Sequence, residues 1–361
     1  MSVCIYSPSE RIWGGGQIYI DNLCRFLNEN NVSASIATSE PESFSSPAIR
    51  MRSASSKRRR LLSSPFLAKK LRSNGVEVVV LNDLASLWLA PVFRLFGLKV
   101  VSLLHLYLQR KNEFGFGHGR MQYHFLRFAS RFAHLVYSVS KENQNSFPVP
   151  VHWVGNFISP WFFESVRVEE KCYDIGLIAR LSIEKNIPLF VELVANLNKF
   201  SERPIKALIV GEGDQDTLIR STIERFGMVD YIELKPWVDR PLLPGIFDQL
   251  RCFAVTSHHE GFATTLLEAH ARGVPAISTR TAGFCAEFIE DIPPNTGLAF
   301  DSSDVESKTF LNEVLMLVDN SALYDKVCRD KAHQFSEELV LGKICSGIET
   351  LFRPPMSKIG Q

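Results

Sequence analysis

The sequence predicts an α/β protein with two doubly wound parallel sheets, one in each half of the chain. Short apolar, β-rich runs alternate with helix-length amphipathic segments throughout the 361 residues, which is typical of parallel sheets covered by helices on both faces. The charges also divide, because residues 1–160 carry 19 Lys and Arg against 9 Asp and Glu, whereas residues 161–361 carry 21 against 30. This division favours two domains with different partners.

The first half is expected to form a domain over residues 1–160, with helices between most of its strands and the first helix over Ile18–Asn28. The expected strands are Val3–Ser7, Ser33–Thr38, Val76–Leu81, Val100–His105, Leu135–Ser140 and His152–Val154. A break is expected near residues 159–171, where Ser-Pro-Trp is followed by a charged stretch.

The second half is expected to form a domain over residues 161–339. The expected strands are Asp174–Ala179, Lys206–Val210, Tyr231–Leu234, Cys252–Thr256 and Ala276–Ser278, with helices over Ile187–Phe200 and Gln215–Phe226. The remaining segment, 340–361, begins with a helical run and has no strand after it, so it is expected to cross back and pack on the first domain. Ligands of such sheets bind beyond the carboxyl ends of the strands.

Several observations favour a cytosolic protein. The chain opens with a strand-like run rather than a signal peptide, and no run of 18 or more apolar residues predicts a membrane-spanning helix. The seven cysteines are scattered without Cys-x-x-Cys spacing, which is typical of reduced thiols.

The most informative feature is a pair of glutamates, Glu260 and Glu268, that flank a turn at Gly261 and a predicted helix start. The free N–H groups of a helix start bind anions, and carboxylates accept hydrogen bonds from hydroxyls. Together they suit a sugar diphosphate. The alternative is structural, because Thr265 followed by Glu268 also has the spacing of a capping box.

Other candidate ligand groups follow predicted strands. Arg180 and Lys185 come directly after the first strand of the second domain. Two such cations are ordinarily solvated surface groups, but their position in this first turn favours a clamp for a diphosphate. The glycine triplet at 14–16 and the Gly211-Glu212-Gly213 turn permit close backbone approach to a ligand, or are plain turns. His105 ends a strand at the ligand edge, where a structural role is equally open.

Two motifs concern metals and membranes. Asp214-Gln-Asp216 has the letters of a metal motif but lies at a helix start, where acids are favoured for electrostatic reasons, so no metal site is expected. The segment Arg50–Arg72 holds nine Lys and Arg, no acid, and interleaved Leu and Phe. This predicts a surface for anionic lipid headgroups rather than nucleic acid, for which no recognition motif is present; a solvated loop is the alternative.

The order of these motifs resembles that of the family 4 retaining glycosyltransferases. A glycine loop is followed by Arg-x-x-x-x-Lys, by Gly-x-Gly, and by Glu-x7-Glu within Glu-Gly-Phe and Leu-Glu-Ala. The resemblance is strongest from Ile178 to Ile289 and looser in the first domain. It implies the GT-B fold, in which two Rossmann-like domains face a cleft, the first binding the acceptor and the second the nucleotide-sugar.

The resemblance also implies roles for individual residues. Arg180 and Lys185 would neutralise the departing diphosphate, Glu260 would contact donor-sugar hydroxyls, and Glu268 would bind the ribose. His105 would line the sugar site, although Leu106 follows it where many members of the family have Asp. The remaining residues expected around the donor are Gly14, Gly15, Gly16, Gly211, Gly213, Gly261, Phe262, Ala263 and Thr264.

The expected function is that of a retaining, metal-independent hexosyltransferase without a cofactor. It would move a sugar from a UDP- or GDP-sugar to a glycan acceptor, lipid-linked, in bacterial lipopolysaccharide or surface-polysaccharide assembly at the inner face of the cytoplasmic membrane. Two alternatives stay open: a sugar-nucleotide epimerase on the same scaffold, and a non-catalytic scaffold subunit.

Overall fold

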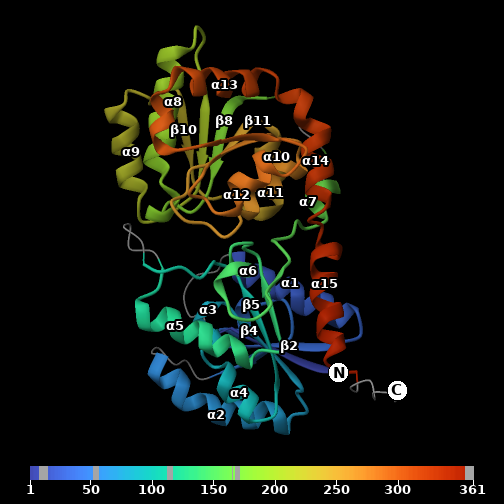
Figure 1. Cartoon of the computed structure of the whole chain (residues 1–361). Helices are drawn as coiled ribbons and strands as arrows, with labels where there is room; N and C mark the ends of the chain where they lie inside the picture. The colour runs from blue at the N-terminus through green and yellow to red at the C-terminus, as the bar shows by residue number, and fades with distance from the viewer. Residues whose placement is uncertain (8–14, 52–56, 112–116, 165, 167–170, 354–361) are drawn as a thin grey trace, which may run out of the picture. The chain divides into compact units, whose positions relative to one another are not determined.

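The computed structural model describes residues 1–7, 15–51, 57–111, 117–164, 166 and 171–353. They form two compact units (Figure 1). Unit 1 comprises Met1–Gly155 and the segment from Glu338 onward, and unit 2 comprises Asn156–Glu337. The chain leaves unit 1 a few residues before the predicted boundary after residue 160, and returns to it close to the one predicted after residue 339.

The described part of unit 1 contains a seven-stranded parallel sheet in the order β3-β2-β1-β4-β5-β6-β7. Its strands are β1 (Ser2–Tyr6), β2 (Ser33–Thr38), β3 (Ala48–Arg50), β4 (Val78–Asn82), β5 (Lys99–Leu104), β6 (Leu135–Ser138) and β7 (His152–Trp153). Its helical segments are α1 (Gly15–Glu29), η1 (Pro41–Ser43), α2 (Lys57–Ser73), α3 (Leu84–Leu87), α4 (Ala90–Leu95), α5 (Arg120–Ala129), η2 (Ser130–Phe132) and α6 (Asn143–Ser146).

The last helix, α15 (Glu337–Thr350), packs on this sheet for reasons that are visible in single residues. A Cβ at Gly347 would lie 1.7 Å from the Tyr137 hydroxyl oxygen of β6, so glycine lets the helix approach this side chain closely. Lys99 of β5 donates a hydrogen bond from Nζ to the carbonyl of Leu351, just beyond the helix. The C-terminal segment is therefore anchored at two neighbouring strands.

The described part of unit 2 contains a six-stranded parallel sheet in the order β10-β9-β8-β11-β12-β13. Its strands are β8 (Tyr173–Ile178), β9 (Ala207–Val210), β10 (Ile232–Lys235), β11 (Leu250–Val255), β12 (Ala276–Thr279) and β13 (Gly297–Phe300). Its helical segments are α7 (Trp161–Glu164), η3 (Ile183–Lys185), α8 (Ile187–Phe200), α9 (Asp216–Arg225), η4 (Arg240–Leu242), α10 (Leu243–Asp248), α11 (Thr264–Ala271), α12 (Phe284–Ala286), η5 (Glu287–Asp291), η6 (Ser302–Glu306), α13 (Lys308–Asp319), η7 (Ser321–Tyr324) and α14 (Asp325–His333).

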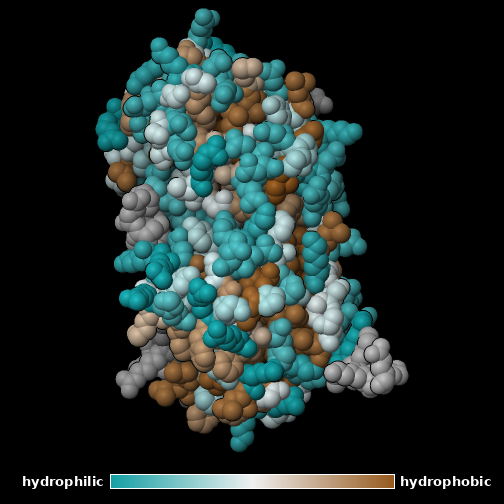
Figure 2. All heavy atoms as spheres, in the orientation of Figure 1, coloured by the Kyte–Doolittle hydropathy of each residue, from teal (hydrophilic) through white to brown (hydrophobic). Residues whose placement is uncertain are grey.

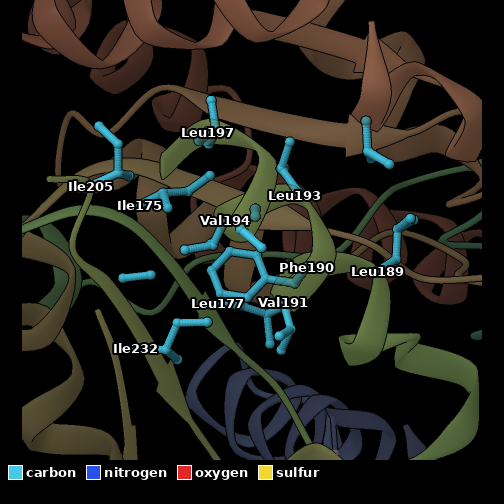
Figure 3. Close-up of a cluster of buried hydrophobic side chains, with 14 of the residues drawn as sticks. Ile175, Leu177, Leu189, Phe190, Val191, Leu193, Val194, Leu197, Ile205 and Ile232 are labelled. Carbon is cyan, nitrogen blue, oxygen red and sulfur yellow. The ribbon is translucent and has the colours of Figure 1, made fainter. Parts of the chain in front are cut away.

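The core of unit 2 forms where α8 covers the sheet. Phe190 and Leu193 of α8 are fully buried and pack among strand residues that include Ile175 and Leu177 of β8 (Figure 3). Each such side chain contributes about 1.5–3 kcal/mol when removed from water. This packing holds β8 in place under α8, and it therefore positions the loop that follows β8.

Both sheets have a switch point, where the direction of the strand order reverses. In unit 1 it lies between β1 and β4, and in unit 2 between β8 and β11, which pair directly through Cys252 and Ile175. Ligands of doubly wound sheets bind beyond the carboxyl ends of the strands at such points. The predicted fold class, with two parallel sheets and covering helices, is confirmed.

Candidate functional site

Two loops at the switch point of unit 2 bring Lys185 and Glu260 together. Lys185 ends η3 after β8, and Glu260 lies between β11 and α11. Thr256 donates from Oγ1 to the carbonyl of Lys185 at 2.9 Å, and His258 donates its N–H to the carbonyl of Glu184 at 2.8 Å. With the loops joined in this way, Lys185 Nζ forms a salt bridge with Glu260 Oε2.

This salt bridge is largely sheltered from water. The side chains of Lys185 and Glu260 are 21% and 15% exposed, and the Ser257 hydroxyl lies 3.4 Å from the same carboxylate oxygen. Partly buried charges are screened by salt much less than surface charges. The predicted diphosphate cation and the predicted sugar-binding carboxylate are therefore partners of one another, which the sequence alone did not indicate.

The turn after Glu260 leads into the first turn of α11. Ala263 is the N-cap residue, and its N–H donates to Cys285 Sγ at 3.3 Å. Among the described residues, no partner is recorded for the N–H groups of Gly261, Thr264 and Thr265. Such orphan donors at a helix start bind anions.

The capping-box interpretation of Thr265 and Glu268 is wrong. The helix begins at Thr264, its N-cap is Ala263, and no side chain caps it. Glu268 is 2% exposed, and its Oε1 accepts a hydrogen bond at 2.8 Å from Arg240 Nη2 of η4. Burial raises the pKa of the Glu268 carboxyl, and Arg240 opposes that shift.

The neighbours of Glu260 serve packing as well as the loop. The Phe262 side chain is buried against Phe284, at 4.9 Å between ring centroids, and against Phe288 and Phe335. Phe262 therefore contributes its main chain to the loop, and its carbonyl accepts a hydrogen bond from Asn156 Nδ2. A Cβ at Gly283 would lie 2.2 Å from the Glu260 carbonyl oxygen, so this glycine lets the turn at Glu260 seat against the start of α12.

The main chain of the predicted Gly-x-Gly turn packs directly against the loop that carries Arg180. A Cβ at Gly211 would lie 1.9 Å from the Ala179 carbonyl oxygen, and one at Gly213 would lie 2.2 Å from that of Leu181. The N–H of Leu181 donates to the Glu212 carbonyl at 2.8 Å. These contacts explain both glycines by close backbone approach, and they leave the Arg180 side chain exposed at the carboxyl edge.

A small cavity lies beside these groups. Its volume is about 20 Å³, and its lining includes Ala179, Lys185, Ser257, Glu260 and Thr265. This is room for about one water molecule. A ligand of nucleotide size must therefore lie over the carboxyl edge of the sheet rather than inside it.

In unit 1, His105 follows β5 and contacts Asn82 at the end of β4. Their Nε2 and Oδ1 atoms are 2.7 Å apart, while the Asn82 amide donates to Ser7 Oγ at 3.4 Å, so Nε2 carries the proton. The ring lies edge-on to Tyr19 at 5.2 Å, and a Cβ at Gly16 would approach it to 3.4 Å. Burial lowers the pKa of His105, which keeps it neutral near pH 7.

Three further predictions concern Gly14, Gly15 and the acids after Gly213. Gly14 lies outside the described residues, and Gly15 begins α1 with open space at its Cα. Asp216 pairs with Arg220 at 2.8 Å within α9. Within the described ranges, no group of three or more His, Cys, Asp or Glu could hold a metal ion, and no helix combines the length and apolarity needed to cross a membrane.

Asn82 and Arg240 are two residues at these sites that the sequence did not indicate. Asn82 ends a strand and could have been found from that position, as His105 was. Arg240 lies 28 residues before Glu268 in a Pro-rich connection, and no spacing rule links the two.

Comparison with known proteins adds to this geometry. Residues 161–334 match the family model described as "Glycosyl transferases group 1", and residues 13–147 match the model described as "Glycosyltransferase Family 4". A curated relative is the GtfA subunit of the UDP-N-acetylglucosamine–peptide N-acetylglucosaminyltransferase of Streptococcus gordonii, 27% identical over 190 residues. That match covers 52% of this chain and 36% of the relative, so the chain spans only about a third of that protein.

Two solved structures share the fold over nearly the whole chain. Anabaena Alr3699/HepE in complex with UDP has a TM-score of 0.77 at 16% identity, and the match covers 97% of this chain and 100% of that one. The lipopolysaccharide outer core galactosyltransferase WaaB in its apo form has a TM-score of 0.76 at 15% identity, with the same shares. At such low identity these likenesses concern the fold alone.

Proposed function

We infer that this chain, which belongs to the family 4 glycosyltransferases, moves a sugar from a UDP- or GDP-sugar to a glycan acceptor with retention of anomeric configuration. The observation that carries the proposal is the meeting of Lys185, Glu260 and the uncapped start of α11 at one switch point. It combines a cation and free N–H groups for a diphosphate with a carboxylate for hydroxyls.

The chemistry asked of these groups is positioning and charge stabilisation. The bond between the anomeric carbon and the phosphate oxygen breaks, and the diphosphate leaves with the bonding electrons. The acceptor hydroxyl bonds to the anomeric carbon on the same face and gives its proton to the leaving phosphate. Arg180, Lys185 and the first N–H groups of α11 offset the charge on the diphosphate. This assignment needs no metal ion and no cofactor.

The two glutamates are proposed to bind different parts of the donor. Glu260 accepts hydrogen bonds from sugar hydroxyls next to the diphosphate, and Glu268, deeper in α11, accepts them from the ribose. In unit 1, His105 contributes a neutral ring whose Nδ1 is an acceptor, because Nε2 is bound to Asn82. The names of the relatives support UDP-sugars as the first donors to test.

We further propose a lipid-linked acceptor, as in lipopolysaccharide or surface-polysaccharide assembly, reached by docking on an anionic membrane. Helix α2 supports this, because Leu61, Leu62 and Phe66 are 43%, 65% and 79% exposed, and Lys69 and Lys70 are exposed beside them. Figure 2 shows hydrophobic residues gathered over the end of unit 1 where α2 and α4 lie. Basic helices with an exposed apolar face bind anionic bilayer surfaces.

The membrane proposal is tested by sedimentation with vesicles. Wild type should bind phosphatidylglycerol-containing vesicles more than pure phosphatidylcholine vesicles, and Phe66→Ser should weaken that binding. Met316→Ser is the matched control, since Met316 is 58% exposed on α13 of unit 2. Equal losses for both variants, or no preference for anionic vesicles, would refute it.

The catalytic proposal is tested with a panel of UDP- and GDP-sugars. Binding raises the melting temperature, because a donor present at 100 times its dissociation constant adds ~2.7 kcal/mol to the free energy of unfolding. The donor that binds is then incubated without acceptor and followed by proton NMR. Slow release of an α- or β-sugar with retained configuration supports transfer, whereas an epimeric nucleotide-sugar would indicate an epimerase. Absence of binding to all donors would refute catalysis and favour a scaffold role.

A further inference from the structure

Arg240 stands beside the donor-binding residues without belonging to the motifs that identify them. It begins η4, in the connection that leaves the carboxyl edge of β10. Its Nη2 donates to Glu268 Oε1 at 2.8 Å, and its guanidinium carbon lies 6.0 Å from the Trp161 ring centroid. The Arg240 side chain is 29% exposed and that of Glu268 is 2% exposed. The partly exposed Arg240 guanidinium therefore contacts a carboxylate that is almost completely buried.

Arg240 is the charged group recorded against Glu268 among the described residues. Several other charged or titratable side chains on α11 and on elements packed against it pair elsewhere: Asp248 with Arg272, Arg251 with Asp174, His270 with Thr296, Arg329 with Asp325, and Lys331 with the Ile292 carbonyl. A buried carboxyl without a cation is held in its neutral form. The charge of Glu268 thus depends on Arg240.

The geometry also leaves part of the carboxylate available. Arg240 holds Oε1, whereas no hydrogen-bond partner is recorded for Oε2 within the described residues. An ionised carboxylate with one oxygen fixed is a strong and oriented acceptor for two adjacent hydroxyls. A neutral carboxyl would offer a weaker acceptor and a competing donor.

We propose that Arg240 is a positioning residue for the donor, holding the buried Glu268 carboxylate ionised and oriented so that it accepts hydrogen bonds from the vicinal hydroxyls of the nucleoside ribose. The proposal rests on the proposed function of Glu268 and adds the residue that makes this function possible at neutral pH. Arg240 itself acts through Glu268 and need not touch the nucleotide.

The test is isothermal titration of UDP, GDP and their 2′-deoxy analogues across a pH series. For Arg240→Gln we expect binding of the ribonucleotide to weaken about tenfold near pH 7, the loss of one charge-assisted hydrogen bond. The fall in ribonucleotide affinity on the acid side of the pH series should also begin at a higher pH than in wild type, because without Arg240 the Glu268 carboxyl ionises less readily. Arg240→Lys should largely restore both. Arg220→Gln is the matched control, since Arg220 pairs with Asp216 on the surface of α9.

The preference for ribose over 2′-deoxyribose separates this role from a merely structural one. It should shrink in Arg240→Gln, and adding Arg240→Gln to Glu268→Gln should not reduce it further. An unchanged pH profile in Arg240→Gln, an equal loss for ribose and deoxyribose, or an additive loss in the double variant would overturn the proposal. If wild type binds neither UDP nor GDP, the proposed function itself fails and this inference with it.

Discussion

Lys185→Ala should lower both stability and turnover, because Lys185 forms a salt bridge with Glu260 and is the proposed cation for the diphosphate. Lys185→Ala leaves the Glu260 carboxylate, 15% exposed, with the Ser257 hydroxyl as its one remaining recorded side-chain partner among the described residues. Breaking a fully buried pair costs about 3–5 kcal/mol and a surface pair about 0–1 kcal/mol. The observed exposure lies between these limits, so we expect about 2 kcal/mol, which corresponds to a fall of about 4–8 °C in melting temperature for a domain of this size.

The double-mutant cycle with Glu260→Gln measures the contact itself. Glu260→Gln alone should cost about 1 kcal/mol, and the double variant should cost less than the sum by about 1 kcal/mol, since residues in contact do not add. Differential scanning calorimetry of the four proteins gives these values. Turnover of Lys185→Ala should fall by about 10²–10³, the usual loss for one preorganised charge contact.

Arg180→Ala is the matched control for this cycle. Arg180 precedes Lys185 in the same loop but is exposed, so its removal should change stability by less than about 0.5 kcal/mol. Its turnover should still fall, because in the proposed mechanism Arg180 offsets the charge on the departing diphosphate. Strict additivity of Lys185→Ala and Glu260→Gln, with no melting change in either, would mean that the pair does not exist in solution and would refute the reasoning.

Three other outcomes are expected. Glu268→Gln should weaken free UDP or GDP in a titration, whereas Glu260→Gln should leave nucleotide affinity nearly unchanged and lower transfer; equal effects confined to melting temperature would contradict the division of roles. Gly213→Ala should cost about 1–3 kcal/mol in urea unfolding, because its Cβ would lie 2.2 Å from the Leu181 carbonyl oxygen, whereas Gly342→Ala, in open space within α15, should be neutral or stabilising. Burial lowers the pKa of His270 to about 3, so the unfolded chain binds the proton first as pH falls below about 6.5. Between pH 7.5 and 5.5 wild type should therefore lose about 1 kcal/mol more stability than His270→Gln.

The strands that the sequence predicted are those with a buried, β-branched or otherwise apolar run. All five residues of β4 are buried, and a short run so rich in β-branched residues favours a buried strand over a helix. The two strands that were missed lack this signal. β3 is an edge strand of three residues without a buried one. β13 begins with Gly297, and a glycine at that point in a sequence usually indicates a turn. In the sheet it is needed because a Cβ there would lie 1.7 Å from the Ala276 carbonyl oxygen of β12.

The neighbouring positions of Lys185 and Glu260 were predictable, but their pairing was not. Each follows a strand of unit 2, and parallel strands bring their carboxyl ends to one edge of the sheet. The ion pairs that organise unit 2 join residues 75 positions apart for Lys185 and Glu260, and 28 for Arg240 and Glu268. Such contacts depend on the packing of whole loops, so no local spacing rule contains them.

The two ion pairs also determine what is left to attract the donor. Glu260 is offset by Lys185 and Glu268 by Arg240, so the four charged groups nearly cancel before the donor binds. A nucleoside diphosphate brings negative charge that this balance does not neutralise. If the proposed donor site is correct, exposed Arg180 and the N–H groups at the start of α11 supply the attraction for the diphosphate. Lys185 would then have to leave Glu260 to reach the phosphate, and Glu260 would become a better acceptor for the sugar hydroxyls. In that case binding of the diphosphate and of the sugar would be coupled through one side chain.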